Sequence, residues 1–180
     1  MQDLLKIAKE NGFSSTESMN FYHGPIVKFS NEIIEEKECN VLDLGCGNGF
    51  LLKKIKEINQ KITPYGIDLN EKAVETARIL QPEFSSNFFT GNIFDANSIL
   101  PKDTMFELVI IMPGRLLELK DEEKRRQFLT WLRESSKNIL VYVYGDWIEK
   151  YGSLKNILEL SEFDIIKEDM ENSLALVNIK

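Results

Sequence analysis

Cysteine, histidine and long apolar runs are scarce in this 180-residue chain. The two cysteines, Cys39 and Cys46, fit no spacing typical of metal sites or redox dithiols, so we expect reduced thiols in a cytoplasmic protein. No apolar run approaches the roughly 18 residues of a membrane span, and Asp3 and Glu10 make the N-terminus unlike a signal peptide. The sequence therefore argues against a disulfide-rich scaffold and against a membrane protein.

The chain also has fewer basic than acidic residues. The formal net charge is −7 and the isoelectric point is near 4.9. Because nucleic-acid binding draws on a basic surface, a nucleic-acid duplex is not expected as the main partner, although a local basic patch is compatible with this composition. The length suits one domain with a core large enough to need neither disulfides nor metals.

The stretch from Val41 to Leu52 organises the rest of the chain. It begins with a short apolar run typical of a buried strand, continues with Gly45, Gly47 and Gly49 in a tight turn, and reaches Phe50 at the start of a helix. Because glycine has no Cβ, a ligand can lie against such a turn, and the helix that follows offers unpaired N–H groups. The order of strand, glycine turn and helix predicts a nucleotide site.

The spacing of the glycines narrows the kind of nucleotide. A dinucleotide fingerprint needs glycine where this chain has Phe50, and a phosphate-binding loop needs a Gly-Lys-Ser/Thr that is missing. The segment from Val41 to Gly49 instead resembles motif I of the class I S-adenosylmethionine-dependent methyltransferases, a hydrophobic strand and an acidic residue before Gly-x-Gly-x-Gly. The resemblance implies S-adenosylmethionine as the cofactor.

The remaining sequence alternates strand and helix in the order of that family. It predicts an α/β fold with a doubly wound, mostly parallel, seven-stranded sheet, in which an antiparallel strand of a C-terminal hairpin is inserted. The resemblance extends from Cys39 to Lys180. The expected strands after the motif are 64–69, 86–90, 106–112, 138–144, 163–170 and 173–179, with helices from Asn70, Asp121 and Ser153.

The first 38 residues precede the motif and are expected to be helical. A short helix from Asp3 to Glu10 should be followed by a second helix that starts near Ser15. Gly24 is expected to break that helix, and Pro25 suits the first turn of a third. In methyltransferases of this class such a leader usually folds over the cofactor. We therefore expect a single domain, 1–180, with a leader, 1–38, and a core, 39–180.

Ligands of open parallel sheets bind outside the carboxyl ends of the strands. Asp68 ends the second expected strand about twenty residues past the glycine turn, where a carboxylate reaches ribose hydroxyls; an exposed helix cap is the alternative. The resemblance implies that Asp43 orients the glycine loop and the methionine part of the cofactor, unless it only accepts bonds from loop N–H groups. Further expected cofactor contacts are Gly45, Cys46, Gly47, Asn48, Gly49 and Met112.

Four more residues are expected to contact the cofactor by resemblance. Asn92 stands where the family usually has an aspartate for the adenine amino group; its carbonyl oxygen can accept instead, or Asp95 can supply the carboxylate. Leu69 and Ile93 are expected to sandwich the purine, unless they belong to the core. Tyr22 is expected to pack against the cofactor or to hydrogen-bond its carboxylate.

Catalytic candidates are His23, Arg115 and Asp146. His23 is the sole histidine and would carry any histidine-based proton transfer, its alternative being a packing role. Arg115 offers a forked cation for a carboxylate or phosphate on the acceptor, or it pairs with Glu118. Asp146 and Trp147 follow the fifth strand, either as a base and an apolar wall or as a helix cap and a core aromatic.

The segment Met112-Pro113-Gly114-Arg115 lies where enzymes that methylate bases or amides commonly have Asn/Asp-Pro-Pro-Tyr/Phe. This difference disfavours methylation of exocyclic amino groups of DNA. We predict a methyltransferase for a small polar or anionic acceptor, as a monomer or homodimer. The alternatives are an RNA or protein methyltransferase and a catalytically inactive subunit that binds the cofactor; a nicotinamide oxidoreductase is more distant.

Overall fold

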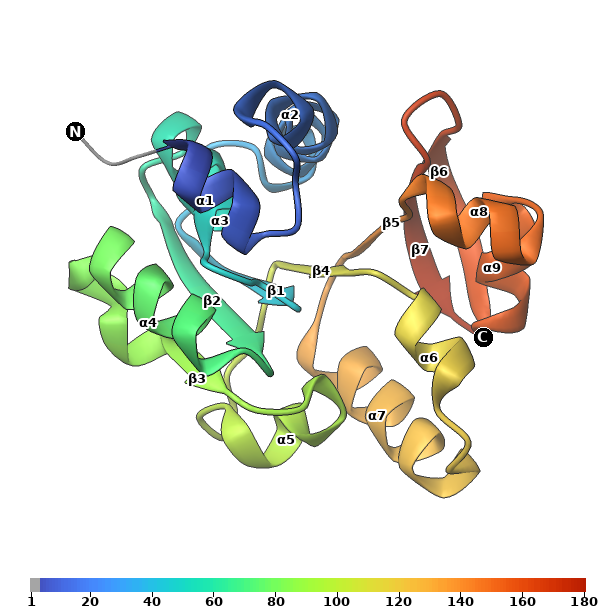
Figure 1. The fold of residues 1–180 in the computed structure, drawn as a ribbon. Helices are drawn as coiled ribbons and strands as arrows, with labels where there is room; N and C mark the ends of the chain where they lie inside the picture. Colours follow the sequence, from blue (N-terminus) through green and yellow to red (C-terminus); the bar gives the residue numbers. More distant parts are fainter. Residues whose placement is uncertain (1–3) are drawn as a thin grey trace.

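The computed structural model describes residues 4–180, without the side chains of residues 145 and 146. Its centre is one seven-stranded sheet in the order β3-β2-β1-β4-β5-β7-β6, with helices packed on both faces (Figure 1). The strands are β1 Cys39–Leu44, β2 Ile62–Asp68, β3 Phe88–Thr90, β4 Leu108–Ile111, β5 Ile139–Tyr142, β6 Phe163–Asp169 and β7 Leu174–Ile179.

The helices follow the strands in the alternation that the sequence predicts. None of the described helices is both long and apolar enough to cross a membrane. They are α1 Leu4–Glu10, α2 Thr16–Ile34, α3 Phe50–Ile58, α4 Glu71–Leu80, α5 Ala96–Ile99, α6 Gly114–Glu118, α7 Glu122–Ser135, α8 Gly145–Tyr151 and α9 Leu154–Leu160, with 3-10 turns η1 Pro82–Asn87 and η2 Ile93–Asp95.

The sheet is parallel from β3 through β5 and antiparallel at its C-terminal edge. Strand order reverses between β1 and β4, since β2 and β3 lie to one side and β5 to the other. β7 inserts between β5 and β6 and is antiparallel to both, so the predicted hairpin and its insertion are confirmed. The topological switch therefore lies directly beyond the glycine turn, where open sheets bind ligands.

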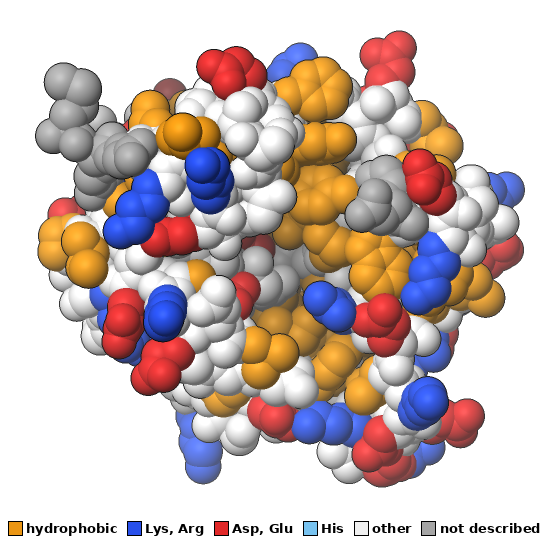
Figure 2. Space-filling model, in the orientation of Figure 1, with side chains coloured by type: hydrophobic (Ala, Val, Ile, Leu, Met, Phe, Trp, Pro, Cys, Tyr) orange, Lys and Arg blue, Asp and Glu red, His pale blue; other side chains and the backbone are white. Residues whose placement is uncertain are grey.

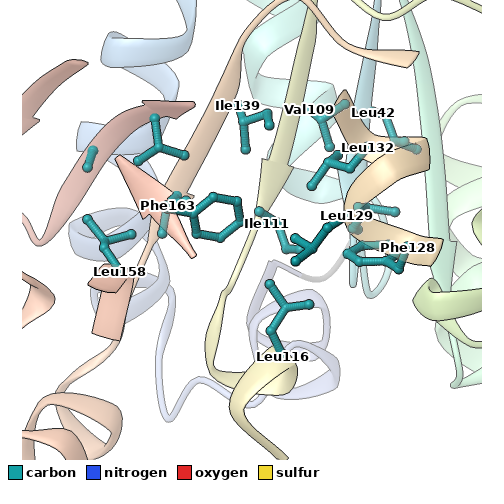
Figure 3. Close-up of a cluster of buried hydrophobic side chains, with 14 of the residues drawn as sticks. Leu42, Val109, Ile111, Leu116, Phe128, Leu129, Leu132, Ile139, Leu158 and Phe163 are labelled. Atoms are coloured by element: carbon teal, nitrogen blue, oxygen red, sulfur yellow. The ribbon is translucent and has the colours of Figure 1, made fainter. Parts of the chain in front are cut away.

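Two apolar layers hold the sheet between the helices. Leu42 and Ile111 face the layer beneath α7, where Phe128, Leu129 and Leu132 pack against them (Figure 3). The alternate residues of β1 and β4 face the other layer, formed by α2, α3 and α4. β4 is buried along its whole length, because helices cover both of its faces, as its uninterrupted apolar run predicts.

The predicted break at Gly24 is wrong, because α2 continues through Gly24 and Pro25 to Ile34. Pro25 removes one backbone donor inside the helix and places its ring against the preceding turn. One buried stripe nevertheless runs along the whole helix and outweighs that local penalty. The stripe consists of Met19, His23, Ile26, Val27, Phe29, Ser30 and Ile34.

Two glycines inside helices provide a matched test of this packing. A Cβ added at Gly24 would meet nothing within 4 Å, so Gly24→Ala should raise the free energy of unfolding by roughly 0.5–1 kcal/mol through helix propensity. A Cβ at Gly114 would lie too close to the indole of Trp147, so Gly114→Ala should lower the free energy of unfolding by about 1–3 kcal/mol. Urea denaturation measures both, and equal effects of the two changes would contradict the packing described.

Candidate functional site

Two cavities lie side by side over the carboxyl ends of β1, β2, β4 and β5. The smaller, of about 220 Å³, is bordered by the glycine turn and by the leader. The larger, of about 490 Å³, extends across the ends of β2, β3 and β4. Figure 2 shows a central hollow on this face, with hydrophobic side chains along its walls and charges of both signs around it. Both cavities are lined by Gly45, Asp68, Met112 and Tyr142.

The glycine turn depends on backbone conformations that favour glycine. Gly45, Gly47 and Gly49 have φ values of 97°, 52° and 69°. At Gly49, an added Cβ would also lie 2.9 Å from the Ala77 side chain and 3.0 Å from Phe88, so α4 and β3 pack directly on the turn. The amides of Gly45 and Cys46 donate to the Ile67 carbonyl at 2.8 and 3.0 Å, which fixes the start of the turn against β2.

Asp68 joins the turn to the end of β2. Its Oδ2 accepts from the Gly47 amide at 2.9 Å and its Oδ1 accepts from the Asn70 amide at 2.8 Å. A carboxylate has about four acceptor positions, so these two bonds leave capacity for a ligand's hydroxyls. Asp68 is half-buried and borders both cavities. A residue that binds the ribose hydroxyls of a ligand, as expected of Asp68, requires such a position.

Asp43 is a buried carboxyl at the floor of the smaller cavity. Its side chain is 2% exposed, and Oδ1 has no hydrogen-bond partner among the described residues. Burial, followed by repulsion from Asp68, raises the pKa of Asp43 to about 7. A cation in this cavity would favour the ionised carboxylate and relieve both effects.

Aromatic rings from the leader and from β5 enclose the smaller cavity. The Tyr144 ring lies 5.1 Å from that of Tyr22 and 6.0 Å from that of Phe13, between ring centroids. The Tyr142 ring is centred 5.2 Å from that of Tyr144. Phe13, Tyr142 and Tyr144 line the cavity, whereas Tyr22 is not among its lining residues and is 39% exposed.

His23 reaches the same cavity from α2. It is 3% exposed, it lies edge-on to Phe13 with 5.3 Å between ring centroids, and its Nδ1 has no partner within residues 4–180 as described. Burial, and then the charge of Lys54, lower the pKa of His23 to about 4. The imidazole is therefore neutral at pH 7.

The larger cavity contains the residues expected around the adenine. Leu69, Asn92, Ile93 and Met112 all line it, and Leu69 is 72% exposed. The Asn92 side-chain carbonyl oxygen accepts from the Phe94 amide at 3.1 Å and so caps η2. Its second acceptor position and the side-chain amide nitrogen are left for a ligand.

Asp95, the alternative carboxylate for the adenine amino group, points elsewhere. It pairs with Lys124 of α7 at 2.6 Å and is not among the residues that line the larger cavity. Of the two alternatives that the sequence left open, the structure brings Asn92 to the cavity.

Cys46 and Asn48 hold the turn in place from beneath. Cys46 is buried, and a Cβ at Gly66 would meet its sulfur at 2.6 Å. The buried Asn48 amide side chain donates to the Ile7 carbonyl at 2.9 Å, and the Asn48 backbone donates to the Asn11 side chain at 3.1 Å. The leader is therefore tied to the glycine turn. Cys39 and Cys46 are both free thiols, and Cys46 alone borders a cavity over the carboxyl ends of the strands.

Of the other catalytic candidates, Arg115 lies at the larger cavity. Arg115 lines it and pairs with Glu118 at 3.0 Å, and Glu118 also lies 3.6 Å from Lys150. Trp147 stacks on Tyr151 with 5.8 Å between ring centroids. Asp146 belongs to α8, but its side chain lies outside the described residues.

Sequence reasoning missed several residues around the smaller cavity. Tyr142 had a usable signal, since it is two residues from Tyr144 and residues two apart at the end of a strand share one face. Glu10, Asn11 and Phe13 had none, because only the docking of α1 on the glycine turn brings them there.

The two buried titratable groups predict opposing effects of pH on stability. The lowered pKa of His23 makes stability increase as pH rises from about 4 to 6.5, whereas the raised pKa of Asp43 makes stability decrease from about 4 to 7. Relative to the parent, Asp43→Asn should raise the free energy of unfolding by about 2–4 kcal/mol above pH 7 and leave it unchanged near pH 4. His23→Phe should raise the free energy of unfolding progressively as the pH falls below 6.5. Urea denaturation at several pH values measures these differences, and differences that do not vary with pH would refute this assignment.

Comparisons with known proteins agree with this architecture. The sequence pattern of a family described as "Methyltransferase domain" matches residues 35–130, which is more than half of the chain. The chain is 33% identical over 164 residues to the release factor glutamine methyltransferase of Fusobacterium nucleatum, a match that covers 81% of this chain and 44% of that protein. The chain thus spans less than half the length of this curated relative.

Two solved structures show the same fold. A TehB-like SAM-dependent methyltransferase from Corynebacterium glutamicum superposes with a TM-score of 0.56 at 15% identity, covering 88% of each chain. An O-methyltransferase family protein from Burkholderia thailandensis gives a TM-score of 0.59 at 15% identity, over 91% of this chain and 57% of that one. The chain therefore belongs to the methyltransferase domain family and has the fold of the class I S-adenosylmethionine-dependent methyltransferases.

Proposed function

We propose that this protein transfers a methyl group from S-adenosylmethionine to a small polar acceptor. The observation that carries the proposal is the pair of adjoining cavities. Asp68 borders both, and the smaller one is lined by Asp43, whose Oδ1 has no partner among the described residues. S-adenosylmethionine, when bound, supplies an electrophilic methyl group on a sulfonium. The leader and the core, 1–38 and 39–180, then act as one cytoplasmic domain, as a monomer or homodimer.

The residues present fit this cofactor in shape and charge. Leu69 and Ile93 offer apolar surface for an adenine, and Asp68 offers acceptors for ribose hydroxyls. The smaller cavity is lined by Glu10, Asp43 and Asp68, and no Lys or Arg is found among its described lining residues. Such a cavity attracts positive charge, which the cofactor carries on its sulfonium and its ammonium.

Catalysis in this proposal comes from alignment and exclusion of water more than from proton transfer. Alignment of the reacting groups can lower the activation barrier by roughly 7–11 kcal/mol, whereas a general base typically raises the rate by about 10²–10⁴-fold. His23 is a weak base because burial lowers its pKa to about 4. Arg115 remains the candidate to bind an anionic group on the acceptor, which would replace Glu118 as its ion-pair partner. Asp146 remains the candidate base.

A protein acceptor is the second candidate, favoured by the relative named for release factor glutamine methylation. The chain departs from the Asn/Asp-Pro-Pro-Tyr/Phe pattern that amide-methylating enzymes commonly have, because it reads Met112-Pro113-Gly114-Arg115. In addition, a carboxylate-lined cavity does not attract RNA phosphates. These two features support a small molecule over either macromolecule.

The carboxylate at the boundary of the two cavities allows a direct test. Asp68→Asn removes the charge that accepts the ribose hydroxyls and should weaken S-adenosylhomocysteine binding by about 10–100-fold. Asp95→Asn is the matched control: this carboxylate pairs with Lys124 outside the cavities and should leave binding unchanged. Calorimetry measures both affinities. An acceptor screen that follows S-adenosylhomocysteine release should show turnover by the parent and a large loss in Asp68→Asn. Undiminished binding by that variant would refute the proposal.

A further inference from the structure

β6 is the last strand of the sheet, and within residues 4–180 no strand pairs with its outer edge (Figure 1). A free edge presents backbone N–H and C=O groups to any strand that can pair with them, so proteins commonly protect it. β6 contains no proline, and residues 164–168 are all exposed. At its centre Ile165 is 37% exposed and Ile166 is 55% exposed. This edge is therefore suited to pairing with a further strand.

A β-bulge decides which side chains of β6 share a face of the sheet. Asp164 lies opposite Asn178 of β7. Lys167 lies opposite Leu176, because the register shifts after Ile165. Residues two apart on β7 point to the same face, so Asp164 and Lys167 share a face as well, although they are three apart in sequence. In a regular strand these two side chains would point to opposite faces.

The bulge makes the edge of β6 complementary to itself. The matching register is antiparallel, with a two-fold axis between Ile165 and Ile166 of both copies. Asp164 of each copy then lies opposite Lys167 of the other, on one face of the joined sheet, and the exposed isoleucines meet at the centre. A register centred on Ile166 would instead place Asp164 opposite Glu168, and like charges placed opposite each other are unfavourable.

The ion pairs that β6 and its neighbours already make are compatible with this register. Lys167 lies 3.3 Å from Glu32 of α2, but its side chain is 57% exposed and an ammonium has three donors, so it can also bind a second carboxylate. Glu162 would lie near Asp169 of the other copy at each end of the contact. Its charge is already balanced by Arg125 at 2.9 Å.

We propose that two copies of this chain pair through the outer edge of β6, in the antiparallel register described, and join their sheets into one. The contact is isologous, since both copies use the same strand. No residue of β6 lines either cavity over the carboxyl ends of the strands, so this inference goes beyond the proposed function and does not depend on it. Because a single strand pair buries little surface, we expect a dissociation constant on the order of 10 µM.

Sedimentation velocity over a concentration series tests the contact. The parent should shift from the 20.8 kDa of one chain towards twice that mass as the concentration rises. Asp164→Lys places two lysines opposite each other on both sides of the axis, and Lys167→Asp places two aspartates there. Each variant alone should therefore dimerise about tenfold more weakly than the parent, or worse.

An equimolar mixture of the two variants tests the register itself. In a mixed pair, each side of the axis again joins a lysine to an aspartate, so the mixture should recover the affinity of the parent. Glu171→Lys is the matched control, because Glu171 is exposed in the turn between β6 and β7, outside the paired stretch. Reversing its charge should leave the dissociation constant of the parent unchanged.

Hydrogen exchange of the parent provides a second readout that needs no variant. The amides of residues 164–168 should exchange more slowly as the protein concentration rises. A parent that stays monomeric up to about 1 mM would overturn the inference, as would a mixture that dimerises no better than its two components. Calorimetry with S-adenosylhomocysteine tests the proposed function separately, since the parent and both variants should bind this ligand equally.

Discussion

The hydrogen bond from the Gly47 amide to Asp68 is the constraint on which the site depends. It joins the turn after β1 to the end of β2, so that the floor of the smaller cavity and the boundary between the cavities have one fixed geometry. Parallel pairing of β1 with both β2 and β4 puts this bond at the topological switch of the sheet. The same bond engages one side of the carboxylate and leaves its remaining acceptor positions for a ligand.

The leader is a structural part of this arrangement. Asn48 is buried beneath α1 and bonds to Ile7 and Asn11, while α2 brings His23 to the cavity wall. The aromatic rings of the leader pack against Tyr144, which follows β5, so the leader and the end of β5 enclose the smaller cavity together. A partly closed site that is lined by aromatic rings and by carboxyls, one of them buried, suits a ligand with positive charge, because an ion pair is stronger where water is excluded.

The fold could be predicted because its local signals agree. The glycine turn, the caps at Asn70 and Asp121 and the apolar run of β4 each indicate the element that is observed. The error at Gly24 and Pro25 arose because tertiary burial of one helix face outweighs a local break signal. At the site, Asp43 and Asp68 were predicted from their places at the carboxyl ends of β1 and β2, and both border the smaller cavity. The positions of Asn11 and Phe13 could not be predicted, since long-range packing of the leader carries no local pattern. The orientation of Asp95 towards Lys124 depends on the position of α7.

The central claim is that both cavities together form one cofactor site. A crystal structure with bound S-adenosylhomocysteine tests it most directly. The account predicts adenine density between Leu69 and Ile93, ribose hydroxyls on Asp68 and the amino-acid group beside Asp43 in the smaller cavity. Well-defined ligand density elsewhere on the protein, with the glycine turn left without contacts, would contradict it.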